Sequence, residues 1–263
     1  SNSICQGENV APLWQTIFEK GFHIDFAHRS FVWDSEAQGK AHVHCVIVGF
    51  SKNPRSTKKI FENNKPILAK NINPYLIDAP SVIVENRSQP LCKIPKIAFG
   101  NQPIDGGFYI FTEEEKNVFL QTEPQAEKFF RTFLGSAEFI NNKKRFVLWL
   151  KNADPSELKQ CPQVLKRIEQ VKNYRLNSTR EVTRQLAQTP TLFAYVSHTE
   201  SNYLLIPRVS SENRKYIPIG FMPPEVISSD RNQIIPNATL YDFGILTSIV
   251  HNAWMRAVCG RLK

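Results

Sequence analysis

Residues 202–221, NYLLIPRVSSENRKYIPIGF, constrain the fold more than any other part of this sequence. Two short apolar segments, 203–207 and 216–219, flank a polar tip. Apolar runs bounded by turn-forming residues are typical of strands, so the stretch predicts a hairpin or a close pair of strands. A tip rich in hydrogen-bonding groups suits either a solvated loop or a binding element. Its polar side chains are Arg208, Ser210, Ser211, Glu212, Asn213, Arg214 and Lys215.

The charge of the chain favours a polyanionic partner. The formal net charge is +9 and the pI is about 9.3. Residues 141–185 hold eleven Lys or Arg against four Asp or Glu, whereas residues 113–115 with Glu123 and Glu127 form an acidic group. Separate basic and acidic surfaces on one protein favour a nucleic-acid partner over nonspecific electrostatic binding.

Length, cysteines and hydropathy bound the class of protein. The 263 residues suffice for one large domain or two. The five cysteines are scattered without a CxxC pair, which favours reduced thiols over a zinc site or a disulfide framework. Because the sequence shows neither an apolar run long enough to span a bilayer nor a basic-then-apolar leader, we expect a soluble, cytoplasmic chain.

The first fifty residues read as helix, strand, loop and strand. Helical spacing of apolar residues over 7–20 predicts a helix that ends at Gly21. Alternation at 22–26 and apolar residues over 41–50 predict two strands, joined through a loop that carries Phe31 and Trp33. Such a unit cannot bury its faces alone and is expected to be the tail of a larger sheet. The polar residues 51–65 are expected to link it to a second module.

The remainder predicts a mixed α+β chain with short strands and basic helices. Thr112 followed by three glutamates is typical of a helix start. Further helices are expected at 124–133, 154–174, 180–187 and 241–263, and strands at 145–150 and 191–196. Frequent prolines between residues 66 and 107 predict extended pieces rather than helices.

No complete active site, cofactor site or metal site is predicted from the residues. Asn73-Pro74-Tyr75 is expected to be a turn, and the glycines at 100, 106 and 107 lack the strand–GxG–helix context of a nucleotide loop. The histidines at 23, 28, 42 and 44 lack metal-ligand spacing.

Several blocks of the sequence carry a resemblance to one family. They include NSICQGENVAPLW, HIDFAHRSFVWDSEAQGKAHVHCVIVGF, GSAEFINNKKRFVLWL, YLLIPRVSSENRKYIPIGF and IIPNATLYDFGILTSIVHNAWMRAVCGRLK. In these blocks the chain resembles the single-chain type IIG (type IIL) restriction–modification enzymes of the MmeI kind. Such bacterial enzymes join an adenine-specific DNA methyltransferase to an endonuclease.

The resemblance implies three regions. Residues 1–50 would be the C-terminal helix and strands of a Rossmann-like, S-adenosylmethionine-dependent methyltransferase domain, 65–225 the target recognition domain, and 226–263 the start of a helical C-terminal region. Double-stranded DNA and the remainder of the methyltransferase chain are the implied partners. S-adenosylmethionine, and Mg²⁺ for cleavage, are implied for the whole enzyme only, because its cofactor, catalytic and nuclease motifs lie outside this sequence.

The resemblance also implies roles for particular residues. The tip residues Arg208, Ser210, Ser211, Glu212, Arg214 and Lys215 match the region where such enzymes read bases, and Arg and Glu are suited to guanine and cytosine edges. Phe31 matches the place of an aromatic ring that stacks on a flipped adenine. Candidate phosphate contacts, which position the protein without specifying sequence, are Lys143, Lys144, Arg145, Arg175, Arg180 and Arg184.

Two other classes of protein remain open on the residues alone. One is an RNA-binding or RNA-modifying accessory protein, which the basic surface and scattered aromatic residues also suit. The other is a scaffold whose polar tip binds protein.

Overall fold

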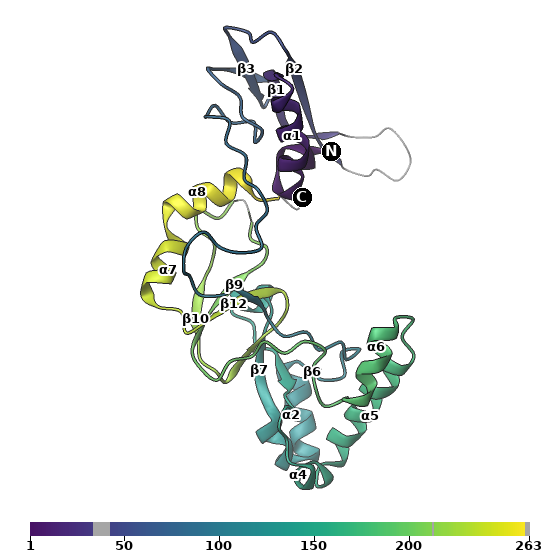
Figure 1. The fold of residues 1–263 in the computed structure, drawn as a ribbon. Helices are drawn as coiled ribbons and strands as arrows, with labels where there is room; N and C mark the ends of the chain where they lie inside the picture. Colours follow the sequence, from purple (N-terminus) through teal and green to yellow (C-terminus); the bar gives the residue numbers. More distant parts are fainter. Residues whose placement is uncertain (34–42, 212, 261–263) are drawn as a thin grey trace. The chain divides into compact units, whose positions relative to one another are not determined.

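The computed structural model describes residues 1–33, 43–211 and 213–260, which divide into two compact units (Figure 1). The first unit joins Ser1–Lys93 to the chain from Ile249 onward, and the second is Ile94–Ser248. Both units mix helices with short strands, which confirms the predicted α+β class. In the described residues no helix is long and apolar enough to cross a membrane.

The first unit is built on one four-stranded sheet of order β2-β1-β3-β4. The strand β1 pairs antiparallel with β2 and parallel with β3, and β3 pairs antiparallel with β4. The elements of this unit are η1 (Asn2–Cys5), η2 (Gly7–Asn9), α1 (Val10–Glu19), β1 (His23–Trp33), β2 (Val43–Ser51), β3 (Lys58–Glu62), β4 (Lys65–Ala69) and α8 (Ile249–Val258).

The predicted first helix is α1, which packs on this sheet through Trp14. The indole is 1% exposed in a cluster with Ile24 and Ala27 of β1, and its Nε1 donates to the carbonyl oxygen of Ile4 at 2.7 Å. The chain leaves the helix at Gly21, whose φ of +78° is favourable only for glycine. The structure therefore confirms the helix that the spacing of apolar residues predicted and its end at Gly21.

Two predictions for the first unit are wrong. The expected loop around Phe31 is the second half of β1, where Phe31 pairs with Cys45 after a register shift. The expected linker 51–65 contains β3 and the start of β4, which meet at a two-residue turn. Asn63 and Asn64 occupy that turn with φ values of 49° and 63°, the conformation that a tight hairpin needs.

The second unit contains two four-stranded sheets, β10-β9-β12-β5 and β11-β7-β8-β6. Its strands are β5 (Ala98–Phe99), β6 (Ile110–Phe111), β7 (Phe130–Leu134), β8 (Phe146–Leu148), β9 (Tyr203–Pro207), β10 (Gly220–Met222), β11 (Val226–Ser228) and β12 (Asn232–Pro236). Its helices are α2 (Glu113–Thr122), η3 (Pro124–Phe129), α3 (Ser136–Ile140), α4 (Pro155–Lys159), α5 (Pro162–Leu176), α6 (Glu181–Gln185), η4 (Leu186–Gln188) and α7 (Leu240–Thr247).

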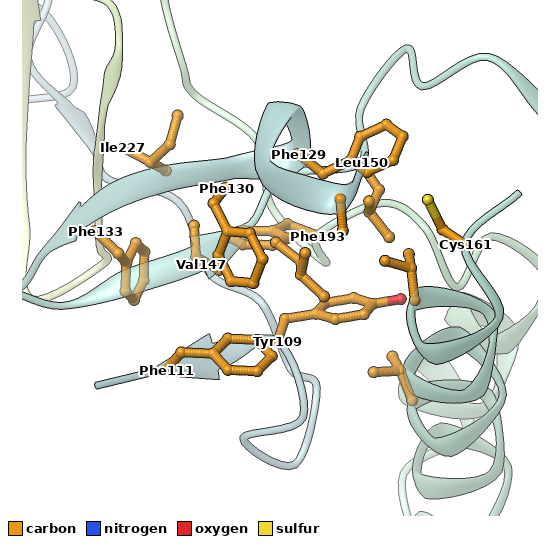
Figure 2. Packing of buried hydrophobic residues seen from close by; sticks show 14 of the residues in the cluster. Tyr109, Phe111, Phe129, Phe130, Phe133, Val147, Leu150, Cys161, Phe193 and Ile227 are labelled. Carbon is orange, nitrogen blue, oxygen red and sulfur yellow. The ribbon is translucent and has the colours of Figure 1, made fainter. Parts of the chain in front are cut away.

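The main core of the second unit is an aromatic cluster between β7, β8 and α5. Figure 2 shows the ring of Tyr109 between the strands and the helix, with Phe111, Phe130 and Phe193 around it. Tyr109 is fully buried, and its hydroxyl donates to the carbonyl oxygen of Pro190 at 2.8 Å. Burial of the apolar side chains in this cluster is the main source of stability for the second unit.

Helix boundaries in the second unit follow the expected capping signals. Thr112 and Glu115 form a reciprocal capping box at the start of α2, as predicted. The expected helix 154–174 is two helices, because Cys161-Pro162 starts a new one. Glu123, which the sequence placed in an acidic surface, is 1% exposed and accepts from the backbone N–H groups of Gln163 and Val164 at the start of α5.

Four further expectations for the second unit are wrong. Residues 130–134 form β7 rather than the end of a helix, and 191–196 make only an isolated bridge, between Gln102 and Tyr195. The second strand of the predicted hairpin is β10, so residues 216–219 lie before it. The last helix is broken between α7 and α8 at Ser248, whose ψ of 153° is extended.

Candidate nucleic-acid interface

The strand that begins the predicted hairpin is the buried centre of its sheet. Tyr203, Leu204 and Leu205 of β9 are at most 1% exposed, and β9 pairs with β10 on one side and with β12 on the other. The Tyr203 hydroxyl donates to the carbonyl oxygen of Val226 at 2.7 Å. Residues 208–219 therefore form a long loop whose two ends are fixed to a rigid sheet.

Arg208 is ordered at the start of this loop. Its backbone N–H donates to the carbonyl oxygen of Arg231 at 3.1 Å, and its Nη1 donates to the carbonyl oxygen of Asp230 at 3.1 Å. Its guanidinium lies over the ring of Phe99, 4.7 Å from the centroid. A cation over an aromatic face is attracted by the ring quadrupole, so the side chain is held in place while remaining exposed.

The tip of the loop is a tight, largely exposed turn. The Ser211 hydroxyl accepts from the backbone N–H of Asn213 at 3.3 Å, and the Ser211 carbonyl accepts from the N–H of Arg214 at 3.1 Å. The Lys215 ammonium lies 5.4 Å from the centroid of the Tyr216 ring. The Ser210 hydroxyl oxygen is buried and has no hydrogen-bond partner within the described part of the chain. Glu212 lies outside the described residues.

A basic segment follows the helix that packs against this hairpin. The Phe139 ring of α3 lies so close to Gly220 that a Cβ there would be 3.0 Å from it. Phe139 belongs to the cluster formed by Tyr203 and Leu205. The end of the loop 208–219 therefore lies next to Phe139 of α3. Phe139 is four residues before Lys143 in the sequence.

The three cations of this basic segment differ in their partners. Lys144 pairs with Glu113 at 2.8 Å, and Arg145 pairs with Glu138 at 3.0 Å. The hydrogen bond and charge of Glu113 raise the pKa of Lys144 above its ordinary value. Lys143 is exposed and forms no ion pair among residues 1–33, 43–211 and 213–260.

Arg175 does not belong to any surface, which corrects its assignment as a phosphate contact. Its side chain is 0% exposed, although its position after Lys172 in a basic helix predicted an exposed one. The guanidinium donates five hydrogen bonds of 2.8–3.1 Å to backbone carbonyl oxygens, which belong to Pro103, Ile104, Leu186, Thr189 and Leu192. Burial and these bonds make Arg175 a structural cross-link, and burial lowers its pKa.

The other two basic candidates lie at α6, Arg180 just before the helix and Arg184 in its last turn. Arg184 donates from Nη1 to the carbonyl oxygens of Ser178 and Thr179, at 2.9 and 3.0 Å. Arg180 is exposed just before α6. Figure 1 draws α5 and α6 apart from β9 and β10 within the second unit, so these arginines would contact a different part of any long partner.

Phe31 belongs to the first unit and is held in β1 by its pairing with Cys45. The ring is half-buried, and its centroid lies 6.5 Å from that of Trp33, which is exposed. A strand fixes the direction of a side chain more firmly than a loop does.

Arg231 was not among the residues predicted for the interface. It lies in the turn between β11 and β12, in the polar run Ser228–Asn232 that separates two apolar strands. The polar composition of this run predicts a turn. No local pattern in the sequence predicts that the turn lies beside Arg208.

The glycines and histidines set aside on sequence grounds have structural roles. A Cβ at Gly100 would lie 2.0 Å from the carbonyl oxygen of Ser229, so this glycine allows two backbones to meet. His28 stacks on Phe61 with ring centroids 4.3 Å apart. Asn73 caps its own turn by accepting from the N–H groups of Tyr75 and Ile77. The described residues contain no group of three or more His, Cys, Asp or Glu side chains that could hold a metal ion.

Comparison with known proteins gives the class and the family of the chain. A model of the MmeI target recognition domain matches residues 78–263, and a model of the MmeI DNA-methyltransferase domain matches residues 1–62. These matches define a target recognition domain preceded by part of a methyltransferase domain. The chain belongs to the MmeI family.

Two relatives extend over the whole chain. DNA methyltransferase A of Bacillus subtilis (strain 168) is 40% identical over 264 aligned residues, which is 100% of this chain and 30% of that protein. The solved structure of the type IIL restriction–modification enzyme MmeI in complex with DNA is 51% identical, with a TM-score of 0.91, and the match covers 100% of this chain and 36% of that one. The chain thus spans about a third of the length of these relatives.

Proposed function

We propose that this chain recognises a specific sequence in double-stranded DNA, as the target recognition part of a restriction–modification enzyme with adenine-specific DNA-methyltransferase activity. The observation that carries the proposal is the match of residues 78–263 to the MmeI target recognition domain. It is supported by the similarity of this whole chain to part of a structure of MmeI in complex with DNA. The excess of basic over acidic residues in 141–185 supports the same conclusion.

Base reading is assigned to the loop that begins at Arg208. Its fixed ends and exposed polar tip suit a groove-reading element, because readout needs a precise position and polar side chains that can reach base edges. The base-reading candidates are Arg208, Ser210, Ser211, Glu212, Arg214 and Lys215.

Phosphate contact is assigned to cations outside the tip. Lys143 offers a free ammonium, whereas Lys144 and Arg145 would exchange a carboxylate for a phosphate on binding. Arg180 and Arg184 would contact the backbone elsewhere. Arg175 is removed from the set, because its five donors are already used inside the protein.

The three predicted regions keep the limits 1–50, 65–225 and 226–263. The first unit therefore holds the end of the methyltransferase domain together with residues 65–93 and α8. Its sheet leaves one edge of β2 without a neighbour among the described strands, and Val43 and Ile47 of that strand are 46% and 48% exposed. An open edge with apolar neighbours suits docking of the remaining methyltransferase chain. Phe31 would stack on a flipped adenine in the assembled enzyme.

S-adenosylmethionine would be bound by the rest of the enzyme. The glycine loop near Gly100 offers no cofactor cradle, because a backbone carbonyl already fills the space beside that glycine. The described residues likewise present no carboxylate cluster for Mg²⁺. We therefore derive no catalytic step from this chain.

The test is a selection by the full-length protein from a pool of duplexes with a randomised core. We expect enrichment of one asymmetric sequence, and an affinity that falls linearly with the logarithm of salt concentration. Replacing Arg214 and Lys215 with Gln should weaken the enrichment, while Lys166→Gln on the exposed side of α5 should not. Equal retention of heparin and duplex with no salt slope, or preference for single-stranded RNA, would overturn the proposal.

A further inference from the structure

The turn that carries Arg231 is fixed by hydrogen bonds to three separate segments of the chain. The Ser229 N–H donates to the carbonyl oxygen of Leu134 at 2.9 Å, and the Asp230 N–H donates to that of Asn101 at 3.0 Å. The Arg231 carbonyl accepts from the Arg208 N–H at 3.1 Å and from the Ser136 hydroxyl at 2.6 Å. The backbone of this turn is therefore held by hydrogen bonds at three consecutive residues, Ser229, Asp230 and Arg231.

The sheet register sets Arg231 opposite Arg208. The strands β9 and β12 are antiparallel, and Pro207 pairs with Asn232. Arg208 and Arg231 are the next residues beyond the ends of these strands, and the hydrogen bond from the Arg208 N–H to the Arg231 carbonyl keeps their backbones side by side. Directly opposite residues of an antiparallel pair project to the same side, with Cβ atoms about 5 Å apart.

Arg208 and Arg231 bring two positive charges to the same place, and no described carboxylate forms an ion pair with either of them. Neither arginine forms an ion pair within the part of the chain that the structure describes, and the Arg231 side chain is exposed and has no hydrogen-bond partner there. The nearest acid in the sequence, Asp230, accepts through Oδ2 from Gln102 at 3.1 Å. Like charges placed directly opposite each other are destabilising, and a bound anion would relieve that repulsion.

Arg208 is oriented in a way that suits an anion more than a base edge. Phe99 covers one face of its guanidinium, and the Asp230 carbonyl occupies one of its N–H groups. The structure thus keeps the side chain at the foot of the loop, beside the sheet, instead of extending it into a groove. Phosphate oxygens accept from arginine at such fixed positions and set the register of a protein on DNA.

We propose that Arg208 and Arg231 bind one phosphate of the DNA backbone together, at the foot of the loop 208–219. The inference rests on the proposed function and refines it, because it moves Arg208 from base reading to positioning and adds a residue outside the tip. Contact with the shared phosphate would fix the position of the loop relative to the DNA groove. The tip residues would then contact the base edges.

The test compares salt dependence for single and double variants of the full-length protein. A duplex of random sequence and a duplex carrying the selected site serve as probes. Each phosphate contact contributes about 0.9 to the slope of log affinity against log salt concentration. Since Arg208 still contacts the phosphate in Arg231→Gln, we expect this variant to weaken binding with little change of slope. Arg208→Gln with Arg231→Gln should reduce the slope by about 0.9 and not by about 1.8, because one phosphate is lost.

Controls separate this contact from other effects. Lys166→Gln should leave the slope unchanged, and the ranking of duplex sequences should stay the same in Arg231→Gln. Arg208→Lys keeps the charge and removes the planar guanidinium, so it reports whether the contacts of that group with Phe99 and with the Asp230 carbonyl matter for binding. Thermal unfolding of each variant checks that the fold is retained.

Three results would overturn the inference. These are an unchanged slope in the double variant, a loss of about 1.8 in that variant, and a changed base preference at one position in Arg231→Gln. If the unaltered protein fails to bind duplex DNA at all, the proposed function itself falls, which is a distinguishable outcome.

Discussion

Gly100 faces the carbonyl oxygen of Ser229 so closely that a Cβ at Gly100 would lie 2.0 Å from that oxygen. The Gly100 N–H also donates to the carbonyl oxygen of Asn232, at 3.0 Å. Beside it, Asn101 donates from Nδ2 to the Ser228 carbonyl at 2.9 Å and accepts from the N–H groups of Ser197 and His198. These contacts join the chain before β6 to the turn that carries Arg231.

Gly100→Ala should therefore destabilise the protein. The added methyl meets backbone rather than a flexible side chain, so the two segments must separate, at a cost of about 2 kcal/mol or more. Urea unfolding measures the change. Gly244→Ala is the matched control, because apart from the backbone of its own helix no described atom lies within 4 Å of the added Cβ, and alanine is favoured in helix α7. An equal effect of both substitutions would contradict the role of the close contact.

Arg175→Met should destabilise the protein severely and leave DNA binding by the folded fraction unchanged. The substitution leaves carbonyl oxygens buried without donors, which costs about 3–5 kcal/mol. Arg175→Lys should recover little, since one ammonium cannot replace a planar five-donor fork. Equilibrium unfolding gives the stability, and Lys172→Met on the exposed side of α5 is the control. A lower salt slope without loss of stability would restore Arg175 as a phosphate contact.

His198 should make the protein less stable as the pH falls below about 6.5. Burial lowers its pKa from the ordinary value of 6.5, and Lys151 and Arg131 lower it further, while Glu200 opposes them. The unfolded chain then takes up the proton before the folded protein does, so stability is present above pH 6.5 and is lost as the pH falls through this range.

The His198 effect is measured by urea unfolding at several pH values. His198→Phe keeps an aromatic ring against Trp149, whose centroid is 5.3 Å away, and removes the titration. We expect a shallower pH dependence in this variant and a steeper one in Glu200→Gln. Identical profiles for the three proteins would show that His198 is not responsible.

A double charge exchange in the loop should change sequence preference. Glu212→Lys with Arg214→Asp reverses a donor and an acceptor at the tip, and the full-length enzyme should then prefer another base pair at one position. Methylation of a library of site variants is the measurement. An unchanged preference with intact activity would exclude the tip as the reading element.

The part of the interface that could be predicted is local. The apolar segment at 203–207, the polar tip and the capping signal at Thr112 each depend on neighbours in sequence, and the structure retains all three. Residues 216–219 have a composition that suits a strand, but the structure assigns them to no strand. Their place in the sheet is taken by β10, whose Gly220 gives Phe139 room to pack.

What the sequence by itself determined is the mixed α+β class, the helix starts and stops, and a family resemblance that comparison with known proteins bears out. Only the tertiary structure decided which basic residues are available. Arg175 and Arg231 have the same side chain and opposite environments, because five carbonyl oxygens converge on one and a surface turn exposes the other. Burial and long-range pairing arise from residues far apart in the chain, and no local pattern encodes them.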